Sequence, residues 1–288
     1  MGDTPTRHGW TARLWRKIPR EMRLPVGATA SVIALVWVVL CLIGPGIVPF
    51  DPLAQDLPRF LAPNAQNWFG TDELGRDVFS RVIAGARVTI ALALLLVAAS
   101  MVVGTVIGLL AGFFGRWVDE LLMRITDVVL AFPTVILAMV TAAALGASLF
   151  NAVLAALIVS WPPYARVVRS LVLSLRGSDF VASGRLLGFS PWRSMRVDIL
   201  PNIAGPTLVM ASLDIGNAAL LLSGLSFLGL GAKPPTAEWG SMISTAVANF
   251  DKWWLGLFPG LAILTVVISF NFLGDALRDA FDPQAARL

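Results

Sequence analysis

Long apolar runs separated by short polar segments dominate this 288-residue chain. About 20 apolar residues are needed to cross a hydrocarbon core of about 30 Å. The pattern predicts six helices near that length, over residues 26–48, 88–114, 127–145, 149–164, 203–230 and 253–273. No segment requires a strand. We therefore expect an all-α membrane protein with six transmembrane helices.

Some of these runs carry distinguishing residues. The third contains Pro133, which predicts a kink, and the fourth is short and holds Pro162 and Pro163. The sixth begins with Trp253 and Trp254, a pair typical of the membrane interface. The first run follows a basic segment but is too long for a signal peptide, so we expect an uncleaved anchor.

Composition narrows the classes of function. The chain is 57% hydrophobic and 14% charged, with a mean hydropathy of +0.77, which does not fit a water-soluble globule. Its single cysteine, Cys41, excludes a disulfide scaffold, and its single histidine, His8, leaves no set for a zinc site or a Ser-His-Asp triad. The sequence lacks the G-x-x-x-x-G-K-[ST] loop that binds ATP phosphates. We expect no catalytic residue, no metal and no cofactor in this chain.

The distribution of positive charge predicts the orientation. A net charge of +4 and a pI near 10.0 could indicate nucleic acid. However, 16 of the 22 Lys and Arg residues fall on the side of the N-terminus and 6 on the opposite side. The positive-inside rule then places both termini and the 164–202 loop in the cytoplasm, in a cytoplasmic (inner) membrane, with no nucleic-acid partner. Residues 10–23 mix apolar and basic side chains, as in a helix in the lipid headgroup layer or a mobile basic tail.

Three stretches resemble one known family. FGTDELGRDVFSRVIAGAR (69–87) and LSFLGLGAKPPTAEWGSMI (225–243) resemble two signatures of the C-type permease subunit of dipeptide and oligopeptide ABC importers. VASGRLLGFSPWRSMRVDILPN (181–202) resembles the cytoplasmic EAA loop of the same permeases. The resemblance extends from about Phe50 to Asp279, with the three stretches in order.

The resemblance implies a type I ABC importer permease that translocates short peptides by alternating access. Its partners are then a homologous second permease, two ATP-binding cassette ATPase subunits that bind the ATP, an extracytoplasmic substrate-binding protein and membrane lipid. Relatives with these signatures also import nickel chelates, which is the alternative. A passive channel explains the spans but not the cytoplasmic loop, and an intramembrane protease is disfavoured because Asp214 is the only acid deep in a predicted span.

The cytoplasmic loop predicts two short helices. Ser178 or Asp179 can cap the first, Gly188 can end it, and Ser190 before Pro191 can begin the second. Apolar side chains at Leu186, Leu187, Phe189, Trp192 and Met195 are too many for a solvated loop, so the loop docks on a partner or on the chain's own helix ends. The resemblance implies an ATPase contact through Ala182, Gly184, Leu186, Leu187, Gly188, Phe189, Trp192 and Pro201. The family usually carries glutamate where this chain has Ala182, so the contact rests on apolar groups or on Asp179.

Asp214 lies near the middle of the fifth predicted span. An acid at that depth should face the bundle interior, where it lines the translocation pathway or makes a structural hydrogen bond, for example to Asn217. Many relatives carry a glutamate just before the 225–243 stretch, where this chain has Leu222; Asp214 is a candidate for a displaced equivalent.

Two further patterns concern packing. Gly104, Gly108 and Gly112 recur every four residues and predict a bare ridge for close helix packing, which could also allow sliding. The charged residues between the first two spans predict a capping and ion-pair network rather than a ligand site; they are Asp72, Glu73, Arg76, Asp77 and Arg81. The expected organisation is a basic segment (1–25), an anchor (26–48), an extracytoplasmic signature segment (49–86), a permease core (87–279) and a cytoplasmic tail (280–288).

Overall fold

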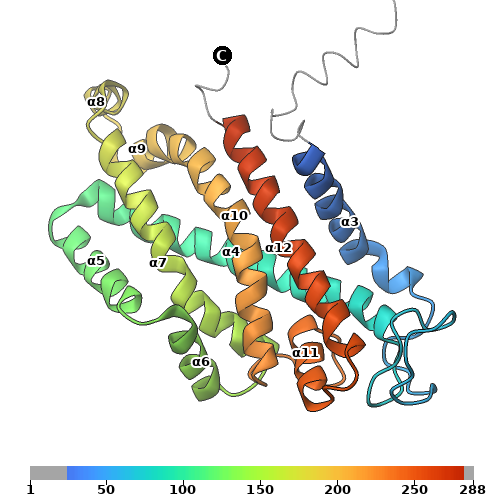
Figure 1. The fold of residues 1–288 in the computed structure, drawn as a ribbon. Coiled ribbons are helices and arrows are strands. Elements are labelled where there is room, and N and C mark those ends of the chain that lie inside the picture. Colours follow the sequence, from blue (N-terminus) through green and yellow to red (C-terminus); the bar gives the residue numbers. More distant parts are fainter. Residues whose placement is uncertain (1–24, 282–288) are drawn as a thin grey trace, which may run out of the picture.

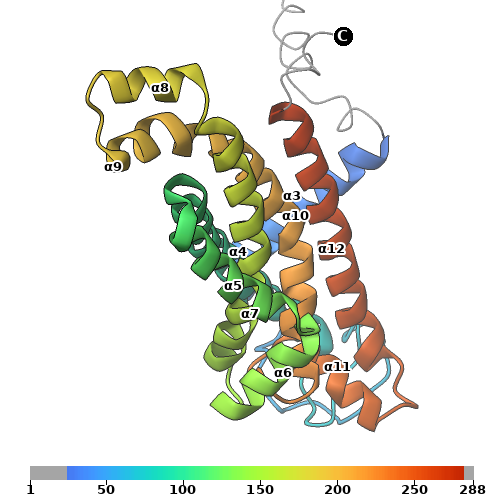
Figure 2. The same cartoon turned by 90° about the vertical axis from the view of Figure 1, so that its left-hand side faces the viewer.

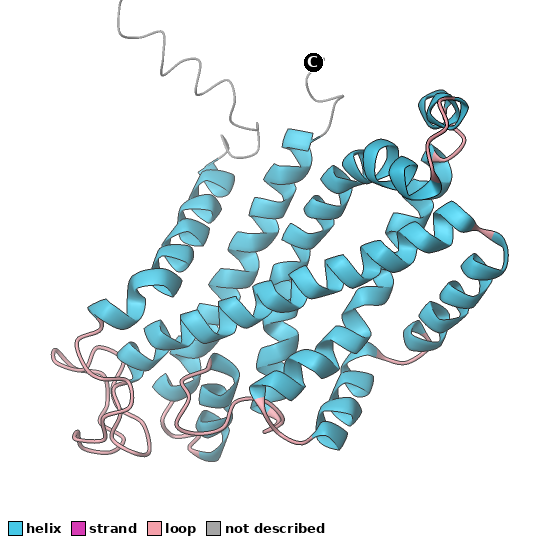
Figure 3. Ribbon diagram, turned by 180° about the vertical axis from the view of Figure 1, so that it is seen from behind, coloured by secondary structure: helices cyan, strands magenta, loops and turns pink. Residues whose placement is uncertain are grey.

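A computed structural model describes residues 25–281 and shows them as helices joined by loops, with no strand in that range (Figures 1 and 3). The only bridge between extended residues there pairs Thr71 with Asp77. The elements are α3 (Pro25–Ile47), α4 (Val78–Phe114), α5 (Arg116–Leu130), α6 (Thr134–Leu145), α7 (Leu149–Leu175), α8 (Asp179–Leu186), α9 (Pro191–Ser194), a π-helical turn (Met195–Ile199), α10 (Leu200–Phe227), α11 (Trp239–Ala248) and α12 (Trp254–Phe281). The all-α prediction is confirmed. The expectation for residues 10–23 lies outside the described residues.

Among the described residues, four helical stretches are long and apolar enough to cross a membrane: α4, α7, the α9–α10 run and α12. The pair α5 and α6 passes the same test when taken together, although the two helices are bent by 90°. The apolar part of α3, Thr29–Gly44, is shorter than these. Four or five spans are therefore present by length and composition, and six remains a prediction.

Several predicted boundaries were wrong. The run 127–145 is divided between two helices, although the kink predicted at Pro133 is present: α5 ends at Leu130, α6 begins at Thr134, and the two are bent by 90°, because proline lacks the N–H needed to continue a helix. The run 149–164 is not short: α7 continues through Pro162 and Pro163 to Leu175. The loop of 164–202 is correspondingly smaller, and residues 176–199, here called the coupling segment, connect α7 to α10.

The bundle has two distinct ends. The coupling segment lies at the same end as the start of α3 and the end of α12 (Figures 1 and 2). The long loop of residues 48–77, α11 and the turn between α6 and α7 lie at the opposite end (Figures 1 and 3). Of the stretches that carry the family resemblance, 69–87 and 225–243 therefore begin or end near one end of the bundle, and 181–202 lies at the other.

The three spaced glycines of α4 form its contact with α7. A side chain at Gly104 would meet Trp161 and Tyr164, and one at Gly108 would meet Ala165 and Val168. Gly112 lies in the same way against Val172 and Arg169. The two backbones therefore approach closely along three turns, as small residues allow in membrane helices.

Tryptophans fix the end of the bundle that carries α11. Trp239 is fully buried and its indole N–H donates to the carbonyl of Val82, at 2.9 Å. Trp254 is also buried and donates to the carbonyl of Thr71, at 3.2 Å. Only Trp253 of the adjacent pair is exposed, at 56%. The interfacial position of this pair stays a prediction, and the structure adds that Trp254 is a core residue.

Candidate functional site

A cavity of about 300 Å³ opens between α5, α6, α7 and α10. Most of its lining is apolar, and its polar members are Thr134, Ser160, Asp214 and Asn217. Asp214 is the fifteenth residue of the 28-residue helix α10, so it lies halfway along the helix. The structure thus places the acid singled out in the sequence at the wall of a cavity between four helices.

Asp214 is held by a hydrogen bond from another helix. The hydroxyl of Tyr164, on α7, donates to Oδ2 of Asp214 at 3.1 Å. The amide of Asn217 lies 3.5 Å from Oδ1, one turn along α10. Tyr164 is fully buried, whereas Asp214 is partly exposed. The buried hydroxyl of Tyr164 therefore orients the carboxylate of Asp214, which still lines the cavity.

Two ion pairs join α5 to α7. Arg169 holds Asp119 through two contacts, including Nη2 to Oδ2 at 2.6 Å. Arg166 holds Asp127 through Nη2 and Oδ1 at 2.7 Å. Thr126 is the buried residue of α5, and the less exposed of the two ion pairs, Arg169 with Asp119, helps attach α5 to the bundle.

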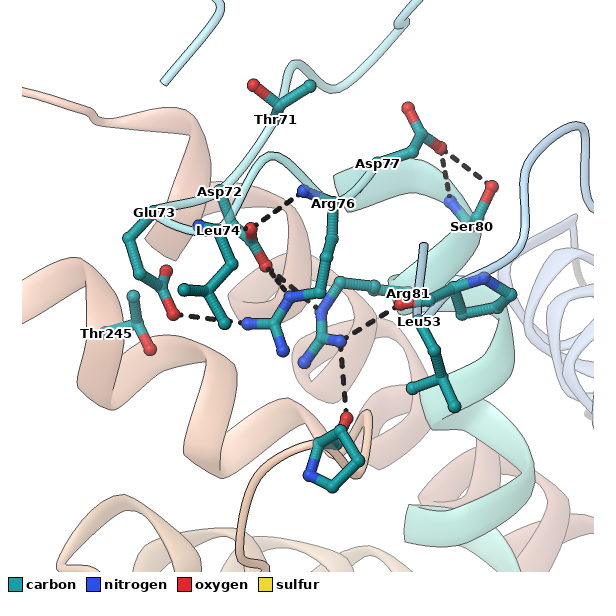
Figure 4. Close-up of polar contacts among 12 residues, drawn as sticks. Leu53, Thr71, Asp72, Glu73, Leu74, Arg76, Asp77, Ser80, Arg81 and Thr245 are labelled. Carbon is teal, nitrogen blue, oxygen red and sulfur yellow. Dashed lines mark hydrogen bonds and ion pairs between the residues drawn. The ribbon is translucent and has the colours of Figure 1, made fainter. Parts of the chain in front are cut away.

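The charged residues before α4 form the network predicted from the sequence (Figure 4). Arg76 pairs with Asp72 at 2.6 Å and with Glu73 at 3.2 Å, and Arg81 lies 3.4 Å from Asp72. Asp77 caps α4 by accepting from the backbone N–H of Ser80 at 2.8 Å. The side chain of Arg81 also donates to the carbonyls of Pro52 and Pro235, at 3.1 and 3.4 Å.

Glu238 is a buried acid that the sequence reasoning missed. Its carboxylate accepts from the N–H groups of Gly240 and Ser241, at 3.0 and 2.9 Å, which caps α11. It also accepts from the hydroxyls of Ser223 at 3.2 Å and Thr89 at 3.4 Å, on α10 and α4. Burial raises the pKa of Glu238 above its usual value, and these hydrogen bonds oppose that rise. Glu238 therefore ties three helices together at this end of the bundle.

The coupling segment has the predicted pair of short helices. Gly188 has a φ of +79°, in the left-handed region, and follows α8. The hydroxyl of Ser190 accepts from the N–H of Arg193 and so caps α9. The hydroxyl of Ser178 instead donates to the carbonyl of Leu175, at 2.6 Å, so it does not supply the expected cap for α8.

The apolar side chains of this segment divide into two groups. Leu186, Leu187 and Trp192 are 89%, 77% and 64% exposed. Ala182, Gly188 and Pro201 are exposed as well, while Phe189 is half-buried under the guanidinium of Arg193, 3.9 Å from the ring centre. Met195 is buried at 2%, so of the two alternatives given for these side chains it follows the second and packs within the chain itself. Gly184 is also buried, against Asp198 and Phe189.

The structure separates the predicted residues into three places. Asp214 and Asn217 share the cavity, the glycines form the α4–α7 contact, and the loop residues lie at the end of the bundle. Leu222 is buried in the core, and the acid that accepts from its neighbour Ser223 is Glu238, 15 residues further along the chain, rather than Asp214. The sequence analysis also missed Tyr164. It is the only tyrosine of the chain and ends the short predicted run 149–164, and this was a signal that could have identified it.

These features define a multi-pass helical membrane protein with a largely apolar cavity that contains one acid, and with an exposed apolar segment at one end. Residues 104–287 match the family described as "Binding-protein-dependent transport system inner membrane component". The chain belongs to this family, and it is therefore a transport component of the inner membrane rather than an enzyme. The family description names no cofactor.

Named relatives match most of the chain. The probable D,D-dipeptide transport system permease protein DdpC of Escherichia coli (strain K12) is 43% identical over 91% of this chain and 88% of its own length. The dipeptide transport system permease protein DppC of Alkalihalophilus pseudofirmus is 40% identical over 94% of this chain and 90% of its own length. The nickel transport system permease protein NikC of Escherichia coli (strain K12) is 46% identical over 82% of this chain and 86% of its own length. The resemblance to C-type ABC permeases is confirmed.

Proposed function

We propose that this chain is the permease subunit of an ABC importer for short peptides. The observation that carries this proposal is the similarity, over nine-tenths of the chain, to permeases named for dipeptide transport. The fold agrees with it, because several spanning helices surround a cavity with a central acid. The chain supplies the pathway and leaves energy conversion to other polypeptides.

The partners follow from the family. The words "binding-protein-dependent" imply a substrate-binding protein, and an ABC importer further requires ATPase subunits and a second permease. Two ATPases bind the ATP, and a homologous permease completes the pathway with this chain. The expected organisation, from the basic N-terminal segment to the cytoplasmic tail, is part of this proposal.

The coupling segment is the proposed ATPase contact. Its exposed side chains Leu186, Leu187 and Trp192 form an apolar surface that a soluble subunit can bury. Ala182 lies on the same short helix, and its methyl group leaves the contact without the charge of the usual family glutamate. Gly184, Gly188, Phe189 and Pro201 shape the segment rather than supply its exposed apolar area.

Asp214 is the proposed contact for the substrate on its way through the bundle. Peptides carry a terminal ammonium group, and a carboxylate that faces a cavity can bind it. Asn217 adds a polar group on the same helix face. The positive-inside rule places the coupling segment and both termini in the cytoplasm, so the cavity lies between the outer loops and the ATPase contact.

A nickel chelate is the second candidate substrate, because the nickel permease relative has the highest identity of the three relatives described above. The complete importer in sealed vesicles containing ATP separates the two. We expect uptake of a labelled tripeptide to depend on ATP and on the binding protein. Uptake of radiolabelled nickel in place of the peptide would support the alternative, and peptide uptake without ATP would indicate a passive channel.

A further inference from the structure

The exposed ion pair between Arg166 and Asp127 joins α7 to α5, one helical turn from residues of these helices that line the Asp214 cavity. Arg166 Nη2 lies 2.7 Å from Asp127 Oδ1, and the two side chains are 58% and 56% exposed. Arg166 is the eighteenth residue of α7, so it lies roughly 25 Å along this spanning helix. Charged groups in spanning helices are costly in lipid and mark functional positions.

The helix register places this ion pair on the faces that line the cavity. Pro163 of α7 and Leu130 of α5 are lining residues. Arg166 is three residues after Pro163, and Asp127 is three residues before Leu130, so each lies one turn away on the same face. The ion pair therefore borders the cavity on the side of the coupling segment, roughly 4.5 Å of helix rise from Pro163.

The ion pair between Arg169 and Asp119, on the same two helices, provides a comparison, because its geometry is that of a structural contact. Arg169 binds both carboxylate oxygens of Asp119, and the side chains are only 32% and 19% exposed. Arg166 makes one contact to one oxygen and leaves most of its guanidinium accessible. Because bidentate arginine contacts are the stronger kind, the Arg166 contact is the more easily exchanged of the two.

We propose that Arg166 is a specificity-determining residue that binds the C-terminal carboxylate of a short peptide, in exchange for Asp127. The inference rests on the proposed function. Asp214 takes the ammonium end of the same peptide, so the cavity presents one group of each sign. The substrate class is then a dipolar peptide with both termini free.

The length of a short peptide and the charges involved are both compatible with replacement of Asp127 by the peptide carboxylate at Arg166. A fully extended dipeptide spans at most about 7 Å and a tripeptide about 11 Å, so the proposed site takes peptides of two or three residues between α10 and α7. Asp127 is already more than half exposed, so breaking its ion pair with Arg166 costs little. The number of ion pairs made by Arg166 stays the same before and after binding.

The test compares two peptides that differ only in the terminal carboxylate. The complete importer, in vesicles containing ATP, receives trialanine or trialaninamide at concentrations that saturate the binding protein. Because the binding protein is identical in every sample, a variant-specific change in the ratio of the two uptake rates reports on the permease. We expect Arg166→Gln to lower the preference for trialanine by about tenfold, the loss expected from one charge-assisted hydrogen bond.

Three further variants make the result specific. Arg166→Lys keeps the positive charge and should retain most of the preference, whereas Asp127→Asn removes the competing carboxylate and should retain or increase it. Arg169→Gln should lower the uptake of both peptides by the same factor. An unchanged ratio in assembled Arg166→Gln, with trialanine still imported, would overturn the carboxylate site alone. Failure of the wild type to import trialanine would instead overturn the proposed function.

Discussion

The hydroxyl of Tyr164 donates a hydrogen bond to Asp214 across the contact between α7 and α10, with 3.1 Å between the oxygens. The donor is buried and the acceptor reaches the cavity. Tyr164 thus orients the carboxylate without occupying the space in front of it, and α7 and α10 share one polar group halfway through the bundle.

This contact gives a prediction for two conservative substitutions. Asp214→Asn removes the charge that we assign to ammonium binding and should lower peptide uptake by about tenfold with an unchanged yield of assembled complex. Tyr164→Phe removes only the orienting hydroxyl and should lower uptake less. Uptake kinetics and the yield from size-exclusion chromatography are the measurements. A normal uptake rate in Asp214→Asn would reduce the acid to a structural role.

The glycine contact predicts a stability difference between two Gly→Ala variants. A methyl group at Gly108 would meet the backbone of Ala165 and the side chain of Val168, so Gly108→Ala should destabilise the protein by about 1–3 kcal/mol and lower its Tm in detergent. Gly224 is also helical but has open space around it, so Gly224→Ala should be neutral or slightly stabilising. Equal Tm values for the two variants would show that α4 and α7 are not closely packed.

The coupling segment predicts a matched pair of glycine substitutions. Nothing lies near a side chain at either Gly177 or Gly188, but only Gly188 has a positive φ. Gly188→Val should therefore misalign α8 and α9 at a conformational cost of about 1 kcal/mol or more, while Gly177→Val should have little effect. We expect normal membrane insertion, weak ATPase association and little transport for Gly188→Val alone.

Two charge substitutions test the same surface. Leu187→Asp should have the same effect as Gly188→Val. Leu187 is exposed in this chain and, in the proposed complex, becomes buried against the ATPase, where an unpaired acid is costly. Ala182→Glu should be tolerated, because the position is exposed and the family usually has glutamate there. Binding-protein-stimulated ATP hydrolysis is the measurement. Full stimulation and transport in both Gly188→Val and Leu187→Asp would show that this segment is not the coupling element.

The orientation is tested by single cysteines in a Cys41→Ser background. Ser190 and Lys233 are both exposed; Ser190 caps α9 and Lys233 precedes α11, and these two helices lie at opposite ends of the bundle (Figure 1). An impermeant thiol reagent applied to intact cells should label Lys233→Cys and not Ser190→Cys, and permeabilised cells should show labelling of both. The reverse pattern in intact cells would place the coupling segment outside the cytoplasm.

Glu238 predicts a graded loss of stability. Glu238→Ala leaves the N–H groups of Gly240 and Ser241 without an acceptor and should cost about 1–3 kcal/mol, whereas Glu238→Gln keeps one acceptor oxygen and should cost less. Because the folded-state pKa is raised, the native protein binds the proton more tightly than the unfolded chain. The Tm of the wild type relative to Glu238→Gln should therefore rise as pH falls toward the raised pKa.

The sequence was most informative where one physical effect dominates. Apolar run length revealed the spanning helices, and the positive φ at Gly188 and the cap at Ser190 followed from short-range backbone preferences. The right angle at Pro133 and the continuation of α7 past Pro163 did not follow, since neighbouring helices decide whether a proline bends, breaks or leaves a helix straight.

The candidate site depended on contacts between distant residues. Asp214 stood out alone because an acid is rare in an apolar run, but its partner Tyr164 lies 50 residues away. Glu238 is likewise joined to Thr89 across 149 residues of sequence. A single sequence without related sequences contains no local pattern that predicts such pairs, and the same reason accounts for the burial of Met195 and Trp254.

The length of α4 has a mechanical consequence. Its 37 helical residues extend roughly 55 Å, well beyond a 30 Å hydrocarbon core, and the helix crosses the bundle obliquely (Figure 1). Asp77 anchors its first turn in the outer charged network, and at its other end the carbonyl of Gly112 accepts from Arg176 at the start of the coupling segment, at 3.0 Å. One unbroken helix therefore joins the end of the bundle that we propose meets the binding protein to the end that we propose meets the ATPase. If this helix moves as a rigid body, a tilt imposed at one of these ends displaces the other.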